Sequence, residues 1–121
     1  MTLDFFLAKQ KHKLWLIKVR AYLLNIQSFN LNEAISHTDC ELGKWIYNFG
    51  FETYKDIDEM VELEEIHLNL HAIVRQIIEL KNDNKIEEAF VKFEELKRVS
   101  NAIIYLLNKL EEHIDLSSDL F

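Results

Sequence analysis

The chain has 121 residues, of which 49% are hydrophobic and 29% are charged, and its formal net charge is -7. This length suits one domain with a single core, and the composition is too apolar for a disordered protein and too evenly mixed for a membrane protein. The acidic balance argues against a nucleic-acid partner, because neutralising phosphates requires clustered Lys and Arg. We therefore interpret the basic residues between Lys9 and Arg20 as the solvated face of a helix.

Cellular context is indicated by the absence of two kinds of segment from the sequence. No apolar run approaches the roughly 20 residues needed to span a bilayer, and the N-terminus has no basic stretch followed by an apolar one. The single cysteine, Cys40, contrasts with the paired cysteines of small secreted domains. We expect a cytoplasmic protein without a membrane partner, in which Cys40 is a thiol or a metal-bound thiolate.

The first expected element is a helix from Leu3 to about Ile26. The chain has no proline and only two glycines, so long helices are favoured throughout. Spacings of three and four place one apolar stripe along this first helix, formed by Phe5, Ala8, His12, Trp15, Val19, Tyr22 and Ile26. Residues 27–37 are rich in Ser and Asn, whose side chains compete for backbone hydrogen bonds, and we expect a loop there.

A short second helix is predicted from a capping box, in which Thr38 is followed three residues later by Glu41. It should run to about Phe49. Gly50 is expected to adopt the left-handed conformation that ends many helices, and Thr53 is expected to cap the next helix. Cys40 would then lie in the first turn of the short helix, where unpaired amides favour thiolate.

Two long helices should complete the fold. The third ends near residues 82–83, and Asn84 is expected to start the final helix, which reaches about His113. Their apolar stripes are Met60, Leu63, His67, Leu70, Val74 and Ile77 in one helix, and Ile86, Ala89, Phe93, Leu96, Ile103, Leu107, Leu110 and Ile114 in the other. The turn between them is short enough to make them antiparallel. We predict one all-α domain over residues 1–121, an antiparallel four-helix bundle whose short helix carries Cys40, with a frayed tail from Asp115 to Phe121.

Four residues stand out as candidate metal ligands. His67 and His71 are one helical turn apart and can grip one ion together, although this spacing is common by chance. A zinc metalloprotease would need Glu after the first histidine, and Leu68 stands there instead. His12 lies in an apolar stripe, where its ring nitrogens need partners. Each histidine taken alone reads more simply as a satisfied core residue, but together with a thiolate at Cys40 they suggest a zinc site.

The residues around these positions resemble the chemoreceptor zinc-binding domain family. The resemblance is carried by His12 shortly before Trp15, by the run Cys40-Glu41-Leu42-Gly43-Lys44-Trp45-Ile46, and by His67 and His71 with three residues between them, in that order. It implies a zinc ion held by His12, Cys40, His67 and His71, a homodimer, and fusion to a chemoreceptor signalling region or a diguanylate cyclase. Since this chain ends at Phe121, it is expected either to act alone or to be cut from a longer protein.

The resemblance also implies a regulatory function. Four protein ligands close the zinc tetrahedron and leave no place for substrate, so we expect no enzyme and no catalytic residue. By resemblance the module senses zinc, and oxidant through Cys40, and modulates an attached or partner signalling protein in chemotaxis or in diguanylate cyclase regulation. The alternative is a structural module in which zinc only staples a dimer.

The same residues allow other interpretations of the metal site. A two-metal carboxylate enzyme needs two Glu-x-x-His pairs, and only Glu64 and His67 supply one. His37 is the main competitor for a ligand position, whereas His113, at a helix end, is assigned no metal role. Three carboxylates lie near the ligands in sequence and are interpreted as solvated rather than as hydrogen-bond partners of an imidazole: Asp39, Glu64 and Glu65.

Overall fold

The computed structural model describes residues 4–26 and 40–119, and every regular element within these ranges is helical. Three helices are long, namely α1 (Phe5–Leu23), α5 (Asp58–Asn82) and α6 (Ile86–Asp119). Between α1 and α5 the chain forms a short helical segment, which consists of α3 (Glu41–Trp45), the π-helix η1 (Ile46–Gly50) and α4 (Phe51–Tyr54). The all-α class is confirmed. The expected loop over 27–37 and the cap at Thr38 lie outside the described residues.

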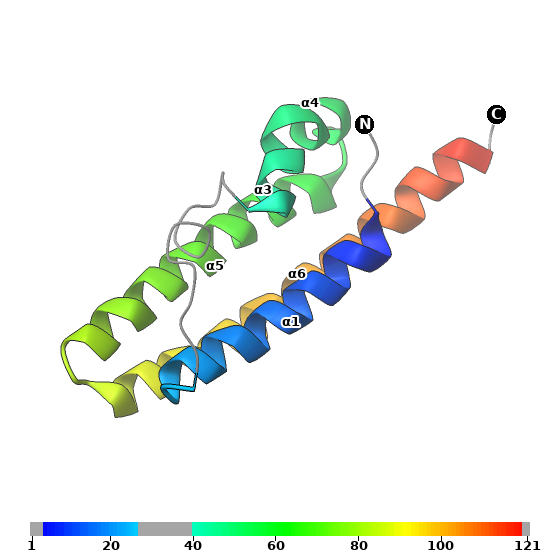
Figure 1. The fold of residues 1–121 in the computed structure, drawn as a ribbon. Coiled ribbons are helices and arrows are strands. Elements are labelled where there is room, and N and C mark those ends of the chain that lie inside the picture. The colour runs from blue at the N-terminus through cyan, green and yellow to red at the C-terminus, as the bar shows by residue number, and fades with distance from the viewer. Residues whose placement is uncertain (1–3, 27–39, 120–121) are drawn as a thin grey trace.

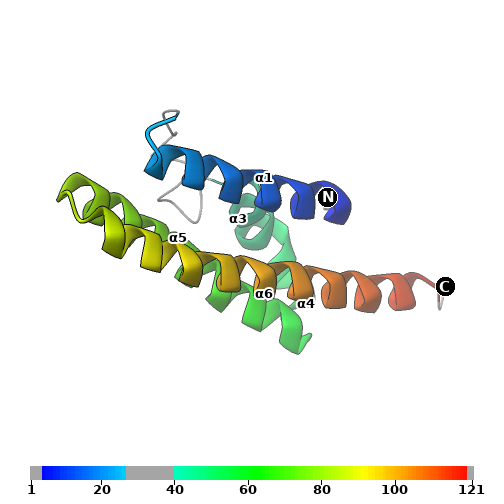
Figure 2. The ribbon, with the colours of Figure 1, turned by 90° about the horizontal axis from the view of Figure 1, so that it is seen from below.

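The long helices lie side by side around α6 (Figures 1 and 2). Helices α5 and α6 pack against each other as an antiparallel hairpin, and α1 packs along α6 in the opposite direction to it. Helices α1 and α5 therefore run the same way. The short helical segment contacts the beginning of α5 through α4, and in chain order it stands where the sequence predicted the short second helix.

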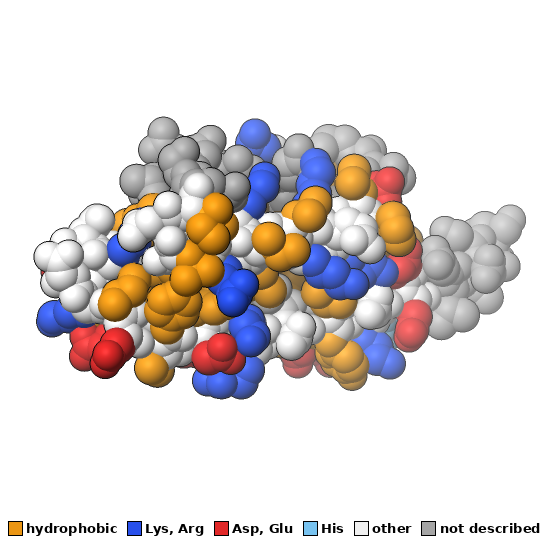
Figure 3. Space-filling view, turned by 60° about the horizontal axis from the view of Figure 1, so that its bottom comes forward, with side chains coloured by type: hydrophobic (Ala, Val, Ile, Leu, Met, Phe, Trp, Pro, Cys, Tyr) orange, Lys and Arg blue, Asp and Glu red, His pale blue; other side chains and the backbone are white. Residues whose placement is uncertain are grey.

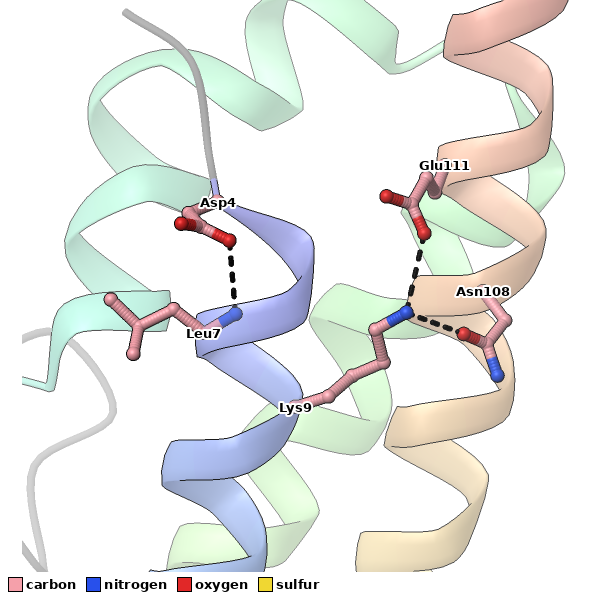
Figure 4. A network of polar contacts seen from close by, with 5 residues as sticks. All are labelled: Asp4, Leu7, Lys9, Asn108 and Glu111. Atoms are coloured by element: carbon pink, nitrogen blue, oxygen red, sulfur yellow. Dashed lines mark hydrogen bonds and ion pairs between the residues drawn. The ribbon is translucent and has the colours of Figure 1, made fainter.

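Helix α1 is shorter at both ends than the sequence pattern suggested. Asp4 is its N-cap and accepts a hydrogen bond from the amide of Leu7 at 3.0 Å, so the helix begins at Phe5 instead of Leu3 (Figure 4). At the other end Asn25 adopts a φ of 59°, and the amide of Ile26 bonds to the carbonyl of Ala21, which is the Schellman pattern. Ile26 thus leaves the stripe and is exposed.

The prediction that Gly50 ends a helix in a left-handed conformation is wrong. Its φ is -64° and its ψ is -46°, which are ordinary helical values, and the helical path continues through α4 to Tyr54. Thr53 consequently lies inside α4 and does not cap α5, whose N-cap is Ile57. Gly50 is needed for space: a Cβ built there would lie 2.5 to 2.8 Å from three ring atoms of Trp45.

The turn between α5 and α6 is short, as expected, but its chemistry differs from the prediction. Asn84 has a φ of 59° and completes a second Schellman motif, in which the amide of Lys85 bonds to the carbonyl of Leu80 at 2.8 Å. Asn84 therefore ends α5 and does not start α6, which begins at Ile86. Helix α6 also continues to Asp119, so most of the tail predicted to fray is helical.

The core lies between the facing stripes of the long helices. All six predicted stripe positions of α5 are buried, and those of α6 are buried apart from Ile86, which is exposed, and Ile114, which is partly buried. Helix α1 contributes Phe5, Val19 and Leu23. Burial of this periodic apolar surface is the main source of stability in a small helical domain.

Two polar contacts fix α1 against the other long helices. The ammonium group of Lys9 donates to Oδ1 of Asn108 at 2.7 Å and lies 3.2 Å from Oε1 of Glu111, both on α6 (Figure 4). At the opposite end Lys81 of α5 donates to the carbonyl of Tyr22 at 2.8 Å and lies over the ring of that residue. Among the described helices, none combines the length and the apolar character that crossing a membrane would require.

Candidate metal centre

Helix α5 supplies two imidazoles that face each other in the interior. His67 and His71 are one turn apart, both are buried, and their Nε2 atoms are 3.2 Å apart. Their ring centroids lie 4.7 Å apart with the planes nearly perpendicular. Because both residues sit in the middle of a 25-residue helix whose neighbouring stripe positions are packed, their spacing is fixed by the backbone.

The thiol of Cys40 meets this pair from the short helical segment. Cys40 is the N-cap of α3 rather than a first-turn residue, with an extended backbone at φ -76° and ψ 157°. The amide of Gly43 donates to Sγ at 3.3 Å, and Sγ lies 3.1 Å from Nε2 of His67. A sulfur that accepts a backbone amide at a helix start is held in a fixed direction, here toward α5.

The three ligand atoms form a cluster that fits zinc. They all lie within 4.8 Å of one another. In a tetrahedral site with Zn–N near 2.0 Å and Zn–S near 2.3 Å, two nitrogens are separated by about 3.3 Å and a nitrogen and a sulfur by about 3.6 Å. The two Nε2 atoms of His67 and His71 already have this spacing, at 3.2 Å. Sγ of Cys40 lies 3.1 Å from Nε2 of His67 and would need to move outward by about 0.5 Å. One thiolate with imidazoles is also a donor set that zinc prefers.

His12 lies beside the cluster and is not part of it in this structure. Its ring centroid is 6.4 Å from that of His67, whereas two imidazoles on one tetrahedral ion have centroids about 5 Å apart. Its Nδ1 atom is buried and, among the described residues, has no hydrogen-bond partner. The assignment of His12 as a fourth ligand stays a prediction.

The electrostatics of the site keep His12 neutral. Burial, and to a smaller extent the nearby His71, lowers its pKa from the usual value of 6.5 to about 4. A neutral imidazole has a lone pair available, which is the form that binds metal ions. An orphaned, neutral, buried ring nitrogen beside a cluster of three ligand atoms fits the proposed donor set.

Aromatic and acidic side chains surround the cluster. The ring of Trp15 lies 6.0 Å from that of His71. Glu64 accepts a hydrogen bond from Tyr47 of η1 at 2.9 Å, and burial followed by this hydrogen bond raises the pKa of Tyr47 to about 12. Tyr47 could not be predicted from the sequence, because the pattern around Cys40 does not show which residues of η1 lie against α5. This contact ties the segment that carries Cys40 to the helix that carries the histidines.

The remaining candidates lie apart from the cluster or outside the described residues. His113 is exposed, and its Nε2 atom lies 3.3 Å from Oε1 of Glu59, away from the cluster. Glu65 is exposed. His37 and Asp39 fall outside the described residues.

A comparison with known protein families identifies the family to which the central part of the chain is similar. Residues 12–78, more than half of the chain, match the family model described as the chemoreceptor zinc-binding domain. This range begins at His12 and includes Cys40, His67 and His71. No curated protein and no solved structure matches the chain.

Proposed function

The chain belongs to the chemoreceptor zinc-binding domain family, and we propose that it is a regulatory module that binds one zinc ion and modulates an attached or partner signalling protein. The observation that carries the proposal is the cluster of Cys40 Sγ with the Nε2 atoms of His67 and His71. We propose His12 as the fourth ligand. A bound zinc ion supplies a positive charge that joins these side chains at one point.

The positions of the ligands suggest how occupancy affects the fold. Cys40 caps a short helix, His67 and His71 lie on α5, and His12 lies on α1. The long helices are held by their own apolar stripes, whereas α3 has only five residues. Gain or loss of the ligand contacts should therefore move the Cys40 segment more than it moves the three long helices.

A closed site of this kind favours regulation over catalysis. With His12 included, all four tetrahedral positions belong to the protein, and a catalytic zinc site keeps one position for water. We accordingly propose no enzymatic activity.

Metal analysis tests the site directly. Protein purified without added metal should contain close to one zinc per chain, and His67→Ala or His71→Ala should lower the content sharply. His113→Ala is the matched control, because this exposed histidine contacts Glu59 away from the cluster, and it should leave the content unchanged. Full zinc occupancy in both α5 variants would refute the site. His12→Ala should weaken affinity with less loss of stoichiometry if three ligands suffice.

A structural staple is the second candidate, and chelation separates it from a sensor. The ring of Trp15 lies near His71, so its fluorescence should report on the site. In a sensor, zinc removal changes Trp15 fluorescence while helical circular dichroism is retained. In a staple, both signals are lost together because the fold melts. A Trp45→Phe background isolates the contribution of Trp15.

We further propose Cys40 as the oxidant-responsive ligand. Hypochlorous acid transfers oxygen to the thiolate, giving a sulfenic acid and chloride, and the oxidised sulfur is a weaker ligand. Zinc release, followed with a chromophoric chelator, should precede any loss of helicity and should be much smaller in zinc-loaded Cys40→Asp. Equal release from that variant would leave zinc as the sensed species or as a staple.

A homodimer is the expected state of the module. Helix α6 presents the exposed Tyr105 and, along its length, the half-buried Phe90 and Ile104, which offer apolar surface outside the core. Light scattering at micromolar concentration should return twice the chain mass. A monomer mass would contradict the proposal and would assign this surface to another partner.

A further inference from the structure

Helix α1 carries a second apolar stripe on the side opposite to its core stripe. Alternating steps of three and four residues, the a and d positions of a heptad repeat, are occupied by Leu7, Gln10, Leu14, Ile17, Ala21 and Leu24. The four large side chains in this set are 43% to 64% exposed, although they lie in or at the end of a helix whose other side is packed. We call these six positions the α1 seam. Exposed leucines scattered singly need no explanation, but a continuous seam of this length does.

Basic residues flank the α1 seam on both sides. The e and g positions next to it are Lys11, Lys13, Lys18 and Arg20, and all four side chains are exposed. No Asp or Glu occurs between Phe5 and Leu23, although the whole chain has a net charge of -7. The face shown in Figure 3 carries hydrophobic and basic side chains next to one another, and most of its acidic side chains lie toward the lower edge and the right-hand end.

We propose that the α1 seam binds an amphipathic helix of another protein whose own a and d positions are apolar and whose flanking positions are Glu or Asp. The spacing is that of a helix pairing surface, in which a and d side chains interlock and the e and g charges select the partner. A helix with acidic flanks places carboxylates next to these exposed cations, and long Lys and Arg stems can cover the edge of the apolar contact. Gln10 places one polar group in the seam, so the partner should offer a polar side chain opposite it to fix the register.

The same charges disfavour a second copy of this chain as the occupant. Pairing α1 with another α1, whether parallel or antiparallel, places Lys and Arg opposite Lys and Arg along the whole contact. Any homodimer of this chain should therefore use a different face. An anionic membrane is disfavoured as well, because the seam is a narrow a/d stripe and the chain as a whole is acidic.

The experiment uses the full chain and two synthetic helical peptides. Both peptides carry leucine at the a and d positions; one has glutamate and the other lysine at e and g, so that neither pairs readily with itself. We expect the glutamate peptide to bind at least about tenfold more tightly than the lysine peptide at low salt, with the difference shrinking as salt is added. Calorimetry measures the affinity of each peptide for the chain. Peptide binding at the α1 seam does not require zinc, so the result is independent of the proposed metal site.

Variants of the chain test the direction of the preference. Lys13→Glu, Lys18→Glu and Arg20→Glu made together should reverse it, so that the lysine peptide binds more tightly. The matched control changes three exposed cations of another surface, Lys85→Glu, Lys97→Glu and Arg98→Glu, with the same change of net charge, and should keep the original preference.

Three results would overturn the proposal. Equal affinity for the two peptides, or binding of neither, removes charge selection by the seam. Tighter binding to phosphatidylserine vesicles than to the glutamate peptide assigns the surface to a membrane. Loss of a chain dimer in Ile17→Asp, with unchanged circular dichroism, assigns the surface to a second copy. The peptide comparison on the unmodified chain decides the matter even where a variant fails to fold.

Discussion

Replacing Gly50 with alanine should destabilise the protein, although alanine is the better helix former. The backbone there is helical, so alanine gains about 1 kcal/mol from propensity alone. Against this, the new Cβ would lie 2.5 Å from Cζ3, 2.7 Å from Cη2 and 2.8 Å from Cε3 of Trp45. Carbon atoms in contact normally stay about 3.5 to 4.0 Å apart, so the ring must retreat by about 1 Å.

The surroundings of Trp45 decide the magnitude. The side chain is only 5% exposed, Tyr54 stacks on it at a centroid distance of 6.2 Å, and Phe5 packs edge-on at the same distance. Overpacking of a confined site costs about 1 to 3 kcal/mol, and the rigid ring places this case near the upper end. After the propensity gain, Gly50→Ala should lose about 2 kcal/mol, or about 8 °C in Tm for a domain of this size.

Urea unfolding followed by circular dichroism measures this loss. Asn48→Ala is the matched control, because Asn48 is an exposed position of the same π-helix, and its change should stay within about 0.5 kcal/mol. In a Trp45→Leu background the added methyl group has no ring to meet, so the penalty should disappear or become a gain. If Gly50→Ala is as stable as the unmodified protein, Gly50 is not required for the packing of Trp45 and the steric reasoning is wrong.

Three further predictions follow from contacts between the helices. Tyr47 should titrate near pH 12, and because its folded pKa exceeds the unfolded value of 10, its contribution to stability should be constant below pH 10 and fall as pH rises toward 12. An absorbance titration should show this high transition in the unmodified protein and lack it in Tyr47→Phe. Asn84→Gly should raise the unfolding free energy by about 0.5 to 1 kcal/mol and Asn84→Ala should lower it, because only glycine relieves backbone strain at a φ of 59°. Equal urea midpoints for the two variants would contradict this. Lys9→Met should lower the unfolding free energy by about 1 kcal/mol, and by less at high salt, because it removes the contacts to Asn108 and Glu111. An unchanged urea midpoint at low salt would show that these contacts contribute nothing to stability.

The sequence predicted the long helices well because their apolar spacing is a local property. The stripe of α5 and most of the stripe of α6 are buried as expected, and His67 and His71 face the same way because four residues make about one turn. The position of Cys40 beside these histidines depends on how the segment between α1 and α5 folds back. Periodicity does not predict this position, and only the resemblance to the family motif indicated it.

The errors concern residues whose role depends on neighbours that a pattern does not reveal. Gly50 suggested a helix end because glycine often ends helices, but its smallness serves the ring of Trp45, five residues earlier. Asn84 suggested a cap at the start of a helix, but asparagine also tolerates the left-handed conformation that closes one. The π-helix over Ile46–Gly50 has no marker in the sequence, since its wide turn is set by packing.

The arrangement of α1, α5 and α6 has a consequence for the order in which the chain folds. The α5–α6 hairpin closes through a short turn, so its loop entropy is small, whereas Lys9 and Asn108, which join α1 to α6, are 99 residues apart. Contacts between distant parts of the chain form more slowly than local ones. The hairpin that carries both histidines should therefore form before α1 docks. Docking of α1 then becomes a late kinetic step, so His67 and His71 are in place on the hairpin before His12 on α1 arrives beside them.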